Sequence, residues 1–255
     1  MAKNSALNID VTPGGSATIT FPSSTGTLAT LAGTEALSNK TLTLASGSTA
    51  TAPLKMTSGT NLTTATAGAM EYDGKVFYAT PVAGARGVNI NTQYSIITSG
   101  NFALSTATGV QSCFPAAGDV WTLEASTSYL FEGQYQITKS GTTTTLGLAF
   151  ALGGGASITK INYYAIGQIN AKNTTSTTQS SAYVDQVAVT SILATGTVGC
   201  FVQFNGIIRM NAGGTVTPQI SFITGNPTSP TMIAGSYIAF TPIGSNTQDQ
   251  QGNVA

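Results

Sequence analysis

Apolar residues occupy every second position in several runs of the C-terminal half of the chain, which is the pattern of a β-strand with one buried face. In TSYLFEGQYQIT, residues 127–138, one face carries mainly aromatic residues and isoleucine, and the other carries mainly Ser, Glu and Gln. Runs of this kind are separated by Gly, Ser, Thr, Asn and Pro. They predict strands at 88–97, 101–104, 119–124, 127–138, 143–152, 156–169, 183–193, 198–211, 215–224 and 232–241.

No segment shows a competing helical period, so we predict an all-β chain. Short strands at this spacing are typical of a two-sheet sandwich. We therefore expect residues 88–243 to form an antiparallel β-sandwich head of the jelly-roll, tumour-necrosis-factor-like (TNF-like) kind, followed by a polar tail at 244–255.

Residues 1–66 differ in character, because Thr, Ser, Ala and Gly dominate and large apolar side chains are sparse. Such a segment buries too little apolar area to offset a chain entropy of about 1–2 kcal/mol per residue. Two interpretations stay open, a flexible linker or β structure completed by identical neighbouring chains. We favour the second, an extended trimerising segment, since SATITF and KTLTLAS alternate small and apolar residues.

Residues 67–87 contain a predicted β-hairpin, AMEYDGKVFYA, and a connector to the sandwich. With Asp73-Gly74 as a two-residue turn, Met70 would pair with Phe77 and Tyr72 with Lys75. An isolated hairpin is marginally stable in water, so we expect this one to act as a collar that contacts structure on both faces.

Several predicted strands carry apolar residues on both faces, and one face would pack in the sandwich while the other needs a partner chain. A closed homotrimer supplies that partner by symmetry. The predicted trimer-interface residues are Phe201, Ile207, Arg209, Tyr72 and Tyr78.

Charged residues form only 7% of the chain, and nine basic and nine acidic side chains give a net charge of zero. Net charge opposes association, so this composition favours an assembled protein. It also lacks the basic excess that nucleic-acid or anionic-membrane binding requires. The start of the chain has no apolar signal region and no run of about 18 apolar residues occurs, so we expect neither secretion nor membrane insertion.

Residues for catalysis are scarce. The chain has no histidine, which removes Ser-His-Asp and Cys-His arrangements. Cys113 and Cys200 lie in apolar surroundings and are predicted to be buried free thiols, with a disulfide between them as the alternative. Glu124 and Glu132 are the acids that a polysaccharide-cleaving enzyme would use. The run Gly153–155 lacks the GK[ST] ending of a phosphate loop and reads as a hairpin turn, so we expect no enzymatic activity, metal or cofactor.

Three aromatic residues are candidates for a binding surface. Trp121, the single tryptophan, suits core packing or sugar stacking. Tyr163 and Tyr164 are adjacent, so one of them must point outward from its strand. The run TTSTTQSSA, residues 174–182, is predicted to be an exposed polar loop.

Several motifs resemble bacteriophage tail-fibre and related virion appendage proteins. They are GTEALSNKTLTLASG at 33–47, ATAGAMEYDGKVFYAT at 65–80 with its G-x-x-E-Y-D-G pattern, YLFEGQYQIT, GIIRMNAGGTVTPQISF and AGSYIAFTPIG. The resemblance implies a trimeric virion structural protein, assembled in the host cytoplasm, with a slender N-terminal part and a β-sandwich head. It implies no catalytic residues.

We therefore expect a homotrimeric tail fibre or appendage that binds other virion proteins through residues 1–80. The sandwich would face outward for host-surface binding, with a cell-surface glycan as its expected partner. A capsid decoration or head-fibre (cement) protein is the alternative. A depolymerase acting through Glu124 and Glu132, and a secreted TNF-like ligand, are the remaining hypotheses.

Overall fold

The computed structural model describes residues 41, 43–116, 118–169, 179–195 and 198–247. Every regular element in this part of the chain is a β-strand and all strand pairs are antiparallel, which confirms the all-β prediction. The chain divides into two compact units, Met1–Leu54 and Lys55–Ala255. The strand expected at SATITF lies outside the described residues, and residues 41 and 43–46 of KTLTLAS form no strand in the single chain.

The predicted hairpin is part of a three-stranded sheet of β1 (Met70–Tyr72), β2 (Phe77–Ala79) and β3 (Gly87–Asn89). The predicted register is wrong, because Tyr72 pairs with Phe77 and Met70 with Ala79. The loop is therefore four residues long. The cause is Asp73, whose Oδ1 accepts hydrogen bonds from the amides of Lys75 at 2.8 Å and Val76 at 2.9 Å, a turn that Asp side chains favour.

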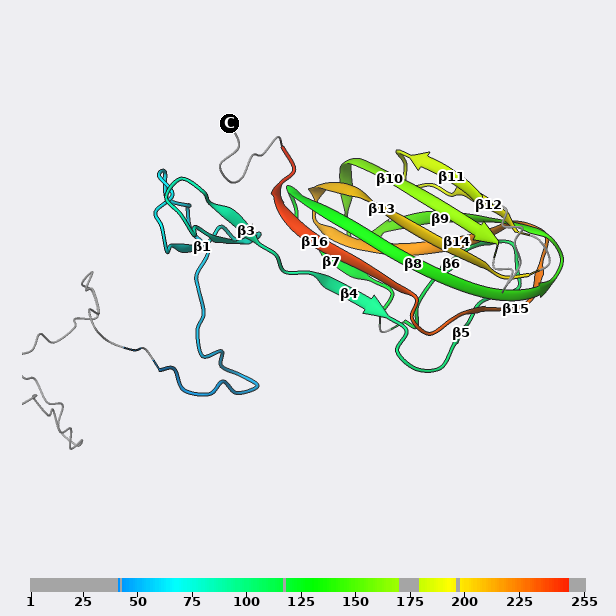
Figure 1. Ribbon diagram of the computed structural model, residues 1–255, viewed down its shortest axis with the longest axis horizontal. Coiled ribbons are helices and arrows are strands. Elements are labelled where there is room, and N and C mark those ends of the chain that lie inside the picture. The colour runs from blue at the N-terminus through cyan, green and yellow to red at the C-terminus, as the bar shows by residue number, and fades with distance from the viewer. Residues whose placement is uncertain (1–40, 42, 117, 170–178, 196–197, 248–255) are drawn as a thin grey trace, which may run out of the picture. The chain divides into compact units, whose positions relative to one another are not determined.

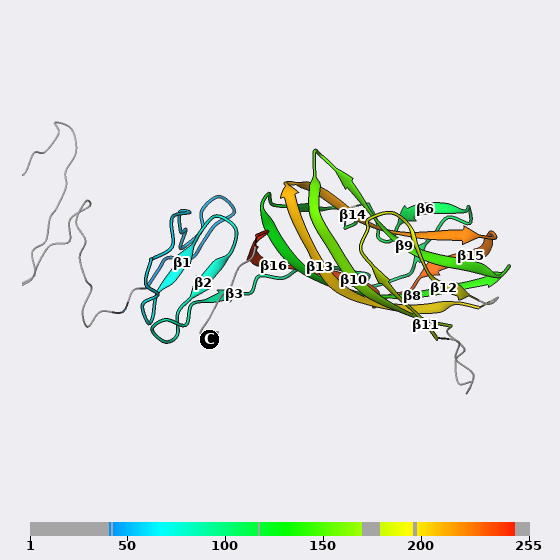
Figure 2. The ribbon, with the colours of Figure 1, turned by 90° about the horizontal axis from the view of Figure 1, so that it is seen from above.

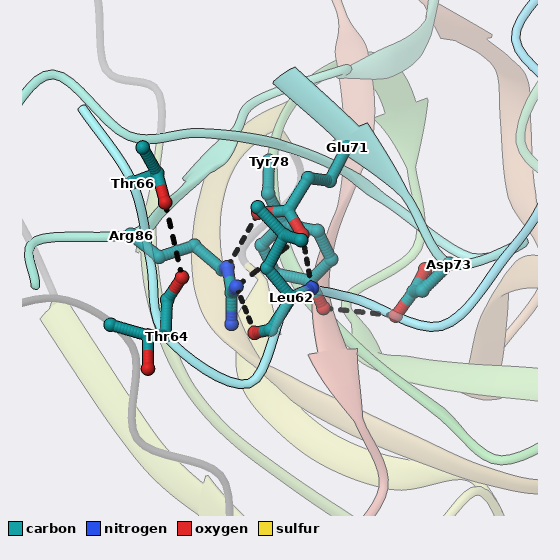
Figure 3. Close-up of polar contacts among 7 residues, drawn as sticks. All are labelled: Leu62, Thr64, Thr66, Glu71, Asp73, Tyr78 and Arg86. Carbon is teal, nitrogen blue, oxygen red and sulfur yellow. Dashed lines mark hydrogen bonds and ion pairs between the residues drawn. The ribbon is translucent and has the colours of Figure 1, made fainter. Parts of the chain in front are cut away.

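A polar clamp ties the preceding loop to this sheet (Figure 3). The Arg86 guanidinium donates from Nε to Glu71 Oε2 at 2.8 Å and from Nη2 to Oε1 at 3.3 Å. Glu71 Oε1 also accepts from the amide of Leu62 at 2.6 Å, and Arg86 donates to the Leu62 carbonyl. Further along the loop, the amide of Gly59 donates to the carbonyl of Tyr72 at 2.9 Å. Residues 55–66 therefore bond to the hairpin that follows them.

The larger sheet of the sandwich has eight strands (Figure 1). The order is β11-β10-β13-β8, after which β16 and β4 continue beside the N-terminal half of β8, and β15 and β5 beside its C-terminal half. The strands are β4 (Gln93–Ile96), β5 (Phe102–Ala103), β8 (Thr127–Gly141), β10 (Ser157–Ile169), β11 (Gln179–Val184), β13 (Cys200–Ala212), β15 (Pro227–Met232) and β16 (Tyr237–Ser245).

The smaller sheet has five strands in the order β12-β9-β14-β6, with β7 also pairing with β14. These are β6 (Gly109–Ser112), β7 (Trp121–Leu123), β9 (Thr144–Gly153), β12 (Thr190–Thr195) and β14 (Gly214–Thr224). The two sheets form the layers of an antiparallel sandwich (Figures 1 and 2), as predicted. The core between them contains an aromatic cluster around Phe131, whose ring contacts those of Phe150, Tyr163, Phe204 and Phe240.

Several strand boundaries differ from the prediction. The expected strand at 88–97 is two strands, β3 and β4, that belong to different sheets. The run 183–193 spans the end of β11 and the start of β12, and residues 179–182 of the predicted polar loop belong to β11. Neither β6 nor β15 was predicted. In β15, Pro227 and Pro230 argue against a strand, yet the ladder accommodates them through a register shift between Thr228 and Thr231.

Candidate functional site

The candidate site is the outer face of the larger sheet, meaning the face turned away from the smaller sheet. Alternation along each strand decides which side chains reach it. In β8, Phe131 and Tyr135 are buried in the core, whereas Leu130 and Glu132, on either side of Phe131, are exposed on the outer face. The same alternation holds in β10 and β13.

Strand register brings six outer-face residues into one continuous line across six strands, which we call the aromatic row. Pairing runs from Tyr183 on β11 to Tyr164 on β10, and from there to Asn205 on β13. It continues to Glu132 on β8, Ala239 on β16 and Tyr94 on β4. At a strand spacing of about 4.8 Å the row spans about 24 Å.

The aromatic row is exposed at both ends. Tyr183 and Tyr94 are 71% and 70% exposed, and Tyr164 is 44% exposed. Large side chains also line both flanks of the row. On one side Leu130 pairs with Ile207, and on the other Gln134 pairs with both Gln203 and Tyr237.

A hollow of about 600 Å³ opens beside the centre of the row. Glu132, Asn205 and Ala239 from the row line it together with Leu130, Ile207 and Thr241. Its wall is completed by Ile90 and Thr92, and the Thr92 hydroxyl lies 2.8 Å from that of Thr241. The lining of the hollow therefore combines apolar side chains with two hydroxyls, one carboxylate and one amide.

The outer face carries few charges, and its cations are already bonded within the chain. Arg209 donates from Nε to the carbonyl of Asn246 at 2.8 Å, and Nη2 donates to the same oxygen. Lys160 forms an exposed ion pair with Asp185 at 3.4 Å. The Glu132 carboxylate has no hydrogen-bond or ion-pair partner among the described residues.

The predicted binding residues separate into core and surface. Trp121 is 6% exposed and its ring lies 5.4 Å from that of Phe240, so it packs in the core. Tyr163 is 2% exposed, and burial raises the pKa of its hydroxyl to about 12. Tyr164 is the tyrosine that points outward, so this member of the predicted set reaches the candidate site.

The predicted interface residues also separate. Phe201, Ile207 and Arg209 lie on the outer face and are half-buried, so the structure places them on the same surface as Tyr164. Tyr72 stacks on Phe77 with ring centroids 4.5 Å apart. Tyr78 is 3% exposed and donates to Asp73 at 3.0 Å, which leaves almost no surface for a neighbouring chain.

The two acids singled out from the sequence lie in different sheets, since Glu132 is on β8 of the larger sheet and Glu124 directly follows β7 of the smaller sheet. Glu132 belongs to the aromatic row, whereas Glu124 contributes its backbone amide as a donor to the Tyr129 hydroxyl at 2.9 Å. Within the described ranges there is no group of three or more Cys, Asp or Glu residues able to hold a metal ion. The described part of the chain also contains no helix that is long and apolar enough to span a membrane.

Sequence reasoning missed Tyr94 and Tyr183 as surface residues, although both fall in predicted strands. The signal that identifies them is the register that joins them through four intervening strands, and register is a property of the folded sheet.

No protein-family model matches this chain, and no curated protein matches it. Among solved structures, a chain from the structure of infectious bursal disease virus Gx strain aligns with 69% of this chain at 10% sequence identity and a TM-score of 0.18. The aligned region covers 44% of that viral chain. A likeness of this size supports no statement about the fold or function of this chain.

Proposed function

We propose that this chain is a bacteriophage virion structural protein, a homotrimeric tail fibre or appendage. Residues 1–80 attach it to other virion proteins, and the β-sandwich faces outward for host-surface binding, with a cell-surface glycan as partner. The order of the motifs at 33–47 and 65–80, followed by the sandwich, supports this proposal.

The observation that carries the proposal is the amount of large apolar surface that the single chain leaves uncovered. On the larger sheet, Tyr183 pairs directly with Tyr164, and Leu130 and Tyr94 lie beside or in the same row; these residues are 71%, 44%, 47% and 70% exposed, in a chain with only 7% charged residues. Soluble monomers rarely expose contiguous apolar patches beyond a few hundred Å². Exposure on this scale is typical of a subunit that is completed by its assembly.

The strand order supports a jelly-roll of the TNF-like kind as the finer description of the sandwich. Consecutive strands β8, β9 and β10 alternate between the two sheets, as do β12, β13 and β14. Connections that cross between the sheets, in place of hairpins within one sheet, are typical of jelly-rolls.

Cryo-electron microscopy of intact particles tests the proposal, since it reports location and copy number together. We expect three-fold density of this chain at low copy number on the tail. High copy number on the capsid surface would instead establish the decoration or head-fibre alternative, and absence of the chain from purified particles would refute both.

A separate assay addresses enzymatic activity, which we propose is absent. Purified protein is incubated with host-surface polysaccharide and the product sizes are measured. Cleavage that is lost in Glu124→Gln or Glu132→Gln would contradict the proposal and identify the acids.

A further inference from the structure

We propose that the outer face of the larger sheet packs against further copies of this chain around a three-fold axis. This inference rests on the proposed homotrimer and names the surface that builds it. The surface is the aromatic row together with the flanking residues Leu130, Ile207, Phe201, Ile166 and Ile96.

The size of the face suits a stable interface. Four rows of outward side chains on each of β10, β13, β8 and β16, with two or three on the shorter β4 and β11, give an area of roughly 700 Å² at a strand spacing of about 4.8 Å and a repeat of about 6.8 Å along each strand. A standard protein interface buries about 800 Å² on each partner. The larger sheet therefore presents enough surface for specific self-association.

The composition of the face also suits a protein partner. Tyrosine is enriched and charged residues are depleted in the cores of protein interfaces. Here Tyr94, Tyr164 and Tyr183 stand exposed in one line, and Leu130 and Ile96 beside them are 47% and 41% exposed. Gln134, Gln203 and Asn205 lie among these residues, so the face mixes aromatic and aliphatic side chains with neutral polar ones, as protein interfaces do.

Charge favours an identical copy over a highly charged partner. Among the described residues of the face, the cations Arg209 and Lys160 are bonded to Asn246 and Asp185 of their own chain, so neither is left without a partner. A second copy is itself neutral, with nine basic and nine acidic residues, and approaches without net repulsion. Glu132 lines the hollow, where its carboxylate can stay hydrated in the assembly. Burial of an unpaired carboxylate would instead cost several kcal/mol.

The first test places a charge on the outer face of the full-length protein. Leu130→Lys introduces an ammonium group beside Ile207, and Val110→Lys is its matched control, because Val110 is 51% exposed on the smaller sheet. Light scattering should give wild type and Val110→Lys three times the 25.8 kDa of one chain. Leu130→Lys should have a lower mass with an unchanged far-ultraviolet circular dichroism spectrum.

Hydroxyl-radical footprinting of the tyrosines supplies the decisive measurement. It reports whether the outer face is accessible to solvent, even if residues 1–80 hold the copies together. We expect Tyr94, Tyr164 and Tyr183 to be protected in wild type and Val110→Lys, and labelled in Leu130→Lys. The buried Tyr135 is the internal reference. Free labelling of the three tyrosines in wild type, or unchanged protection in Leu130→Lys, would overturn the proposal.

Three further outcomes are also decisive. A wild-type single subunit that binds a glycan and loses binding in Tyr164→Ala would replace self-association with ligand binding on this face. Particles that contain the chain with the three tyrosines exposed would refute the interface while leaving the virion role intact. A trimer that buries the face but is absent from particles would support the interface and refute the virion role.

Discussion

Gly206 faces Tyr163 across the β10–β13 pair so closely that a β-carbon on Gly206 would lie 2.4 Å from the Tyr163 Cβ atom. The same β-carbon would lie 2.2 Å from the carbonyl oxygen of Asn162, which belongs to the backbone and cannot rotate away. We predict that Gly206→Ala destabilises the sandwich by about 1–3 kcal/mol or more, the usual cost of overpacking. The midpoint of urea unfolding measures this change.

Gly87→Ala is the matched control for that substitution. A β-carbon at Gly87 meets no atom within 4 Å, and the residue does not need a positive φ. Alanine at such a site changes stability little or raises it by about 0.4–1 kcal/mol. Equal unfolding midpoints for Gly206→Ala and wild type would contradict the packing described around Tyr163.

The sandwich itself was predictable because burial of one sheet face imposes alternation, and alternation is visible in sequence. Local chemistry explains where the prediction was wrong. The Asp73 side chain caps a longer turn than the Asp73-Gly74 pattern suggests, which moves the hairpin register. In β15 the two prolines argue against a strand in the sequence, but the segment pairs with the neighbouring strands β8 and β5.

The candidate site was predictable only in part. Alternation puts one of Tyr163 and Tyr164 outward, but the phase is set by Ile161, Tyr163 and Ala165, which all face the core. The aromatic row depends on pairings between strands far apart in sequence, from Tyr94 to Tyr183. The alternation pattern of a single sequence does not reveal which strands are neighbours in a sheet, so the row can be recognised only in the folded structure.

The clamp of Glu71 and Arg86 predicts a local effect of substitution. The two side chains are only 11% and 18% exposed, and they hold the Leu62 loop through both its amide and its carbonyl. Arg86→Ala should speed hydrogen exchange at the amides of Leu62 and Gly59 while amides of β8 and β13 exchange at the wild-type rate. Arg86→Lys should recover the protection only in part, since an ammonium group lacks the planar fork of guanidinium.

Lys55→Ala is the control for the clamp, because it removes the same charge from an exposed residue with no partner in the described part of the chain. Exchange at Leu62 that is equally fast in Lys55→Ala and Arg86→Ala would show that charge alone, and not the clamp, governs the loop.

The three-stranded sheet of β1, β2 and β3 should lose stability at low pH. Burial by itself would raise the pKa of Asp73, but the amides of Val76 and Lys75 and the Tyr78 hydroxyl donate to its carboxylate and hold the pKa below its usual value. The amide of Leu62 is the largest cause that lowers the pKa of Glu71. A carboxyl with a lowered folded pKa stabilises the fold above its unfolded pKa of about 4, and that stabilisation is lost as the pH falls through the folded pKa.

We therefore expect the amides of Lys75 and Val76 to lose exchange protection as the pH falls below about 4, once the intrinsic exchange rate is taken into account. Asp73→Asn tests the cause, because an amide oxygen still accepts both hydrogen bonds but does not titrate. Protection of Lys75 and Val76 in Asp73→Asn should change less with pH. An identical pH dependence in the variant and in wild type would rule out Asp73 as the titrating group.

Both thiols should be inert in the folded protein. Cys113 and Cys200 are free, and they are 0% and 1% exposed. Burial raises the pKa of Cys113 far above its usual range and that of Cys200 to about 12, although nearby Lys139 partly opposes the second shift. Because the thiolate is the reactive form, a thiol reagent at pH 8 should label neither residue in native protein and both in urea. Rapid labelling of native protein would show that a thiol is accessible, whereas fewer than two thiols per chain in urea would show a disulfide.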